Sequence, residues 1–151
     1  MRNVLAVEEI SQIGNNACWM AVCNMIHLYY RGQRLFWEGR HDADLPGDIN
    51  TVARLNGFRW INVSIDFSEI KKAIDDNQLL LADTTLTNGA GHGVLISGYD
   101  DTNGQQIHVL DPAISNGGIG RWMSYRGTGN YNTGVSSFTM DGLYYAQYDH
   151  L

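Results

Sequence analysis

The stretch QIGNNACWMAVCNMI, residues 12–26, places a cysteine at the start of a pattern typical of an amphipathic helix. Apolar residues recur at steps of three and four from Ala17 to Tyr30, which predicts a helix with one buried stripe. The stripe comprises Cys18, Ala21, Val22, Met25, Ile26 and Tyr29. Because Asn15 and Asn16 are suitable N-cap residues and Gly32 suits the far end, we expect Cys18 in the first helical turn.

Cys18 and Cys23 are the two cysteines of the chain. Five residues apart on one helix, their side chains point about 140° apart around the axis. We therefore expect two free thiols and no disulfide. The free N–H groups and macrodipole of a helix N-terminus favour a thiolate at Cys18, whereas Cys23 lies a turn deeper. The competing interpretation of Cys18 is a small apolar residue in the packed stripe.

Size and composition limit the classes of protein to consider. A chain of 151 residues with 44% hydrophobic residues predicts a single domain over 1–151. The net charge of -6 leaves no cationic surface of the kind that binds nucleic acid. No apolar run approaches the roughly 20 residues of a membrane span. Glu8 and Glu9 interrupt the start too early for a signal peptide, so we expect a cytoplasmic protein or one secreted without a cleavable signal.

The remaining pattern predicts an α+β fold. A long polar connection over 32–48 leads to a short helix near Ile49 to Leu55, and Ser68 is expected to cap a second helix from Glu69 to Asp76. A polar stretch over 129–137 is expected to connect the last two strands. The strands expected are 58–65, 78–83, 91–99, 105–111, 121–128 and 142–149. The cysteine-bearing N-terminal helix should pack on their mainly antiparallel sheet.

A reactive thiol needs a base, and His92 is the best candidate among five histidines. It opens an apolar strand directly after TNGAG, where its ring can face a cleft while Val94 and Ile96 hold the strand in the core. His27 is nine residues beyond Cys18, about 13 Å along the helix, and is too far to act on the thiol. The remaining histidines are expected to be packed or peripheral: His41, His108 and His150.

Asp111 is the expected partner of His92, since a hairpin turning about Thr102 and Asn103 sets Asp111 opposite Val94 and diagonal to His92. A turn one residue later would move Asp111 out of reach, and its plainer role is to end a strand before Pro112. Asp100 and Asp101 are interpreted as turn residues. Gln12 can supply an amide donor to an oxyanion, or it is an ordinary polar loop residue.

Together these residues resemble a known family. Gln12 six positions before Cys18, Trp19 directly after it, His92 in GHGVLISGYD and Asp111 in HVLDPA resemble the papain-like cysteine peptidases. The similarity is greater to the compact bacterial branch that includes the bacteriocin-processing, double-glycine leader peptidases and secreted effector proteases. It spans about Val4 to Ala113.

The resemblance implies a papain-like fold, with Cys18 as nucleophile, His92 as general base, Asp111 as orienting residue and Gln12 as oxyanion donor. It implies a peptide or protein substrate and hydrolysis of a peptide or isopeptide bond through an acyl-enzyme. Two departures are that the CG-x-C-W context around the papain cysteine is missing and that an aspartate stands where papain has asparagine. Substrate and oligomeric state are left open.

Two alternatives remain. The same residues could serve a deamidase, an acyltransferase or a peptidoglycan amidase. A catalytically silent binding module is the alternative from another class, with its tyrosine-rich β end engaging a partner; the same tyrosines could instead be core and strand faces. No cofactor or metal is expected, because the calcium-loop-like HDADLPGD, residues 41–48, has Pro46 at a ligand position and lacks the closing glutamate at Ala53.

Overall fold

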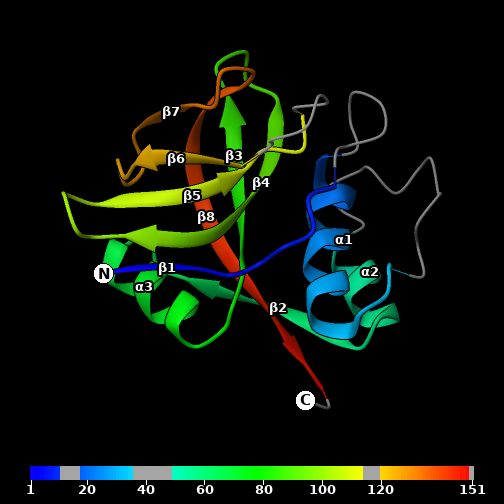
Figure 1. Ribbon diagram of the computed structural model, residues 1–151. Coiled ribbons are helices and arrows are strands. Elements are labelled where there is room, and N and C mark those ends of the chain that lie inside the picture. The colour runs from blue at the N-terminus through cyan, green and yellow to red at the C-terminus, as the bar shows by residue number, and fades with distance from the viewer. Residues whose placement is uncertain (11–17, 36–48, 114–119, 150–151) are drawn as a thin grey trace.

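The structure is a computed structural model that describes residues 1–10, 18–35, 49–113 and 120–149 (Figure 1). The described helices are α1 (Cys18–Arg31), α2 (Ile49–Leu55) and α3 (Phe67–Asp75). The described strands are β1 (Arg2–Val4), β2 (Phe58–Val63), β3 (Leu80–Leu86), β4 (Gly91–Asp100), β5 (Gln106–Leu110), β6 (Gly120–Ser124), β7 (Asn130–Asn132) and β8 (Ser137–Tyr148).

The described strands form one sheet in the order β2-β8-β3-β4-β5-β6, with β1 and β7 added at the margins. β1 pairs with the end of β4 beyond the reach of β3, and β7 pairs with the start of β8. Every pairing among these strands is antiparallel. The fold is therefore α+β with an antiparallel sheet, as the order of the sequence patterns predicts.

The two faces of the sheet carry separate apolar clusters, because side chains alternate along a strand. Leu81 and Leu95 face α1 and α2, whereas Leu80 and Ile96 face α3. Figure 1 shows α1 and α2 together on one side of the sheet and α3 on the other. These four side chains are at most 2% exposed, so the centre of the sheet is buried on both faces.

Helix α1 is buried on more than the predicted stripe. Trp19, Cys23 and His27 lie outside the stripe and are buried as well. They are covered because α2 and the paired strands β2 and β8 pack along the flank of the helix. His27 Nδ1 lies 2.7 Å from the hydroxyl of Tyr148 on β8, so this histidine has a structural partner at the far end of the helix from Cys18.

Helix α3 begins two residues earlier than predicted. Its cap is Asp66, whose carboxylate accepts a hydrogen bond from Ser68 N at 3.1 Å, and Phe67 is the first helical residue. The prediction of Ser68 as the cap is wrong, because Asp66 already provides an extended backbone and a side-chain acceptor two residues before that N–H. The early start adds Phe67 to the apolar face with Ile70 and Ile74.

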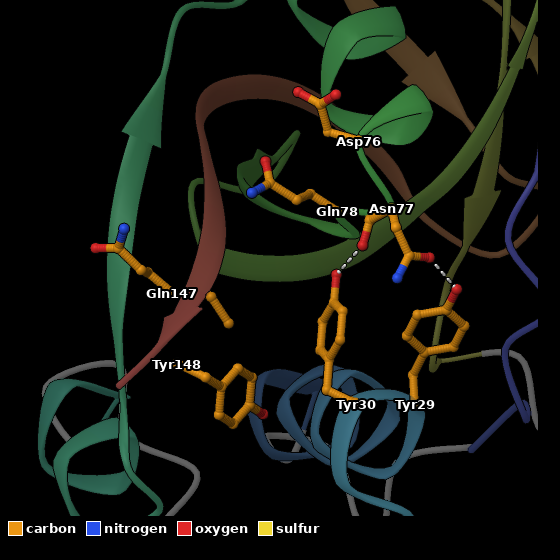
Figure 2. Close-up of a pocket in the computed structure, with 8 residues that line it drawn as sticks. Tyr29, Tyr30, Asp76, Asn77, Gln78, Gln147 and Tyr148 are labelled. Carbon is orange, nitrogen blue, oxygen red and sulfur yellow. Dashed lines mark hydrogen bonds between the residues drawn. The ribbon is translucent and has the colours of Figure 1, made fainter. Parts of the chain in front are cut away.

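The turn after α3 is fixed to the last turn of α1 by two tyrosines (Figure 2). Asn77 adopts a left-handed conformation with φ of 63°. The Tyr30 hydroxyl donates to Asn77 O and accepts from Leu79 N, both at 2.8 Å, and the Tyr29 hydroxyl donates to the Asn77 side chain. Tyr29, Tyr30 and Asn77 border a hollow of about 640 Å³ beside Tyr148. It lies at the opposite end of α1 from Cys18, about 20 Å along the axis.

Strand boundaries depart from the predictions mainly in the second half of the chain. The stretch 129–137, expected to be a connection, contains β7. β8 begins at Ser137 instead of Gly142, and β6 ends at Ser124 instead of Thr128. β1 was not predicted. Three-residue strands such as β1 and β7 are too short to show a period, which explains both omissions.

Within the described ranges, no helix is both long and apolar enough to cross a bilayer.

Candidate active site

The β4–β5 hairpin brings His92 and Asp111 to the same face of the sheet. Next to the turn, Asp100 pairs with Gln106, and a bulge between Ile96 and Gly98 shifts the register so that Leu95 pairs with Leu110. The turn contains one residue more than predicted. The bulge returns the pairing beyond it to the predicted register. Continuing by one step sets Asp111 opposite Val94, which is the register predicted from the sequence.

The imidazole of His92 is bonded to the Asp111 carboxylate. His92 Nε2 lies 2.9 Å from Asp111 Oδ1, and the two side chains are 6% and 0% exposed. The Ser136 hydroxyl lies 3.5 Å from the same nitrogen. The His92 carbonyl accepts a hydrogen bond from Thr84 Oγ1 at 2.8 Å, which anchors the backbone that carries the ring. Both of the side-chain contacts of the ring involve Nε2, so Nδ1 is the ring nitrogen available to contact another side chain.

Asp111 is a buried charge with three hydrogen-bond donors. Besides His92, the Thr133 hydroxyl donates to Oδ2 at 2.7 Å and Ala113 N donates to Oδ1 at 3.0 Å. Burial raises the pKa of Asp111, but the hydrogen bonds from His92 and Thr133 outweigh burial and the pKa is lowered overall. The carboxylate is thus ionised and fixed in orientation at neutral pH.

Cys18 meets His92 from the start of α1. The thiol is 5% exposed and lies close enough to the His92 ring to raise the pKa of that ring. Burial lowers the pKa of His92, but the hydrogen bond with Asp111 and the interaction with Cys18 raise it by more. The net result is a pKa of about 9, above the ordinary value of 6.5. The imidazolium form of His92 therefore persists at neutral pH beside the Cys18 sulfur.

Cys23 has a different environment from Cys18. It is 1% exposed, and burial followed by the proximity of Cys18 raises its pKa to about 12. Both cysteines are free thiols. Cys23 is the packed apolar residue of the helix, and Cys18 is the thiol with a base.

Two residues of the site were not predicted from the sequence. Thr133 and Ser136 lie in the turn between β7 and β8, where Thr133 N donates to Ser136 O at 2.9 Å and Ser136 N donates to Thr133 Oγ1 at 3.1 Å. This closed turn holds the Thr133 hydroxyl against Asp111. A threonine and a serine in a polar stretch are common in loops, so the sequence carried no signal that separates them from ordinary turn residues.

Other residues considered for the site are engaged elsewhere or lie outside the described residues. His108 Nδ1 lies 2.7 Å from the Ser97 hydroxyl, and the His108 ring packs against Trp122. Asp100 accepts from Thr102 N at 2.9 Å, which confirms its role in the turn. Outside the described residues lie Gln12, His41, His150 and the stretch 41–48.

The described part of the chain contains no cluster of three or more histidine, cysteine, aspartate or glutamate side chains placed to hold a metal ion. Cys18, His92 and Asp111 bring together a thiol, an imidazole and a carboxylate bonded to the imidazole. No protein-family model and no curated protein sequence matches the chain.

Proposed function

We propose that this protein is a cysteine hydrolase of the papain-like type that cleaves a peptide or isopeptide bond. The observation that carries the proposal is the buried series of contacts from Cys18 to His92 and from His92 Nε2 to Asp111 Oδ1 at 2.9 Å. A histidine with a purely structural role is not expected to lie between a thiol and an ionised carboxylate.

The chemistry follows from the two sides of the ring. The Cys18 thiolate attacks the carbonyl carbon, a C–S bond forms, and the His92 imidazolium gives its proton to the leaving amine. The acyl-enzyme is then attacked by water, whose proton passes to His92, and the C–S bond breaks to regenerate the thiolate. Asp111 keeps the ring in one orientation throughout. Gln12 remains our expected oxyanion donor, on the basis of its spacing in the sequence.

The experiment compares two cysteine variants against a peptide library, with products identified by mass spectrometry. We expect hydrolysis by the wild type and by Cys23→Ala, and none by Cys18→Ala, because only Cys18 contacts the base. Iodoacetamide should likewise label the wild type at Cys18 first. Circular dichroism establishes that each variant is folded.

Each other outcome contradicts part of the proposal. Conversion of amide side chains to acids without chain cleavage would indicate a deamidase, and transfer to an added amine would indicate an acyltransferase. Full turnover by folded Cys18→Ala, or equal and slow labelling of both thiols, would exclude the thiol mechanism.

A further inference from the structure

Asp83 on β3 is a carboxylate set between two glycines of neighbouring strands. It pairs with Gly93 on β4 and with Gly142 on β8, and it lies on the same strand face as Leu81, toward α1 and α2. Neither neighbour therefore carries a side chain beside the carboxylate. The missing side chains leave space on this face of the sheet.

Aromatic rings occupy that space on both sides. Carbons of the Trp19 indole lie 3.2 Å from where a Cβ at Gly93 would stand, and the Tyr144 ring lies 3.2 Å from where a Cβ at Gly142 would stand. With Trp60 from β2, these rings line a hollow of about 220 Å³ that also contains Asp83. Asp83 is the only carboxylate among the described residues lining the hollow, which is of a size to hold one long side chain.

Among the residues that the structure describes, none bonds to the Asp83 carboxylate. Within the described ranges, it makes no hydrogen bond or ion pair, in contrast to Asp111 with its three donors. Burial, and then the nearby charge of Asp141, raises the pKa of Asp83. An acid held between aromatic rings without a donor is a costly arrangement for folding alone. A cation placed there would satisfy the carboxylate and lie against the ring faces.

The hollow adjoins the candidate active site through the chain itself. Trp19 directly follows Cys18, and Gly93, on which the Trp19 ring packs, directly follows His92. Asp83 faces α1, the helix that carries Cys18, whereas the His92 side chain alternates to the other face of the sheet. Adjacent Cα atoms are about 3.8 Å apart and paired strands about 4.8 Å apart, so the backbone of Asp83 lies within two or three extended peptide residues of the backbone of His92.

We propose that this hollow is a substrate subsite that accepts a cationic side chain, lysine or arginine, two or three residues from the bond that is cleaved. The position of the subsite relative to the cleaved bond rests on the proposed function. Binding of a cation in the hollow does not. The chain's net charge of -6 also favours the approach of basic peptides.

The first experiment measures cleavage of matched peptides that carry either arginine or citrulline, its uncharged isostere, at each position around the scissile bond. At one position within three residues of that bond, we expect arginine to raise kcat/KM at least tenfold over citrulline. Asp83→Asn should reduce this ratio to about one. Asp76→Asn is the matched control and should retain the ratio, because Asp76 is exposed and lines the separate hollow beside Tyr29 and Tyr30.

The second experiment measures binding without turnover, in the Cys18→Ala background. N-acetyl-arginine methylamide should shift the indole N–H signals of Trp19 and Trp60 in NMR spectra, the citrulline analogue should not, and Asp83→Asn should abolish the shift. Equal effects of the arginine and citrulline compounds in both experiments would overturn the subsite. Selective arginine binding by a protein that cleaves no peptide would leave the cation site standing and overturn the proposed hydrolase.

Discussion

At the scale of single residues, the hydroxyl of Thr133 is the least expected component of the site. It is 4% exposed and donates to the Asp111 oxygen that His92 leaves free. Hydrogen bonds to a buried carboxylate contribute about 1.5–3 kcal/mol each. In the proposed hydrolase, Thr133 would act through Asp111, as a positioning residue.

Replacing Thr133 by valine keeps the shape of the side chain and removes the donor. We expect kcat to fall about tenfold with little change in KM, since a 1.4 kcal/mol loss of orientation corresponds to tenfold in rate. The freed carboxylate should also change the pKa of His92, which NMR titration of the ring and the pH profile of kcat would report.

Thr133→Ser is the matched control, because it restores the hydroxyl without the methyl group. It should recover most of the activity and the original pH profile. A Thr133→Val enzyme with unaltered kcat and pH profile would show that the hydrogen bond has no positioning role.

The sequence predicts those site residues whose chemistry is uncommon and misses those whose chemistry is ordinary. A cysteine at the start of an amphipathic helix and a histidine at the start of an apolar strand differ from their surroundings, so Cys18 and His92 could be selected. Thr133 has no such contrast in a stretch rich in glycine, asparagine and serine. Asp83 is the last residue of the apolar run QLLLAD, so the sequence pattern indicates only that a strand ends there.

At the scale of elements, the bulge in β4 determines whether the carboxylate reaches the imidazole. A shift of one residue in an antiparallel pair moves every side chain to the opposite face. The turn is wider than predicted, and the bulge between Ile96 and Gly98 restores the register in which Asp111 meets His92. The sequence patterns could locate both strands, but hairpin register depends on such bulges, which have no sequence period of their own.

The same strand offers a test of packing at two glycines. A Cβ at Gly98 would lie 2.7 Å from Asn3 O and 2.9 Å from Val4 Cα, so β1 would have to move. We expect Gly98→Ala to lower the free energy of unfolding by about 1–3 kcal/mol, as measured by urea denaturation.

Gly91→Ala is the matched control on β4, because nothing lies within 4 Å of its added Cβ. Its unfolding free energy should stay within about 0.5 kcal/mol of the wild type. If both variants unfolded at the wild-type urea concentration, the close approach of β1 to β4 would be refuted.

At the scale of the whole molecule, the His92 pair connects stability to pH. The folded-state pKa of about 9 lies above the ordinary value of 6.5, so the imidazolium is stabilised by folding. This contribution is fully present below pH 6.5 and is lost as pH rises toward 9. His27 and His108 act in the opposite sense, because burial lowers their pKa and folding disfavours their charged forms at acidic pH.

We therefore expect the thermal unfolding midpoint to fall between pH 6.5 and 9 in the wild type. The decline should be smaller in His92→Gln, which has no titrating ring. Calorimetry at half-unit pH intervals measures both curves. Parallel curves over this range would mean that the charge on His92 is not stabilised by folding.

The distribution of the site along the chain has a consequence for biosynthesis. Cys18 leaves the ribosome before the other site residues. His92, Asp111 and Thr133 follow in that order, the last on the order of ten seconds after Cys18 at ordinary elongation rates. Until the sheet closes, the nascent chain carries a thiol with neither its base nor its carboxylate. If the chain is the hydrolase we propose, the order of synthesis delays its activity until Thr133 has emerged, so the nascent polypeptide would not be cleaved before that point.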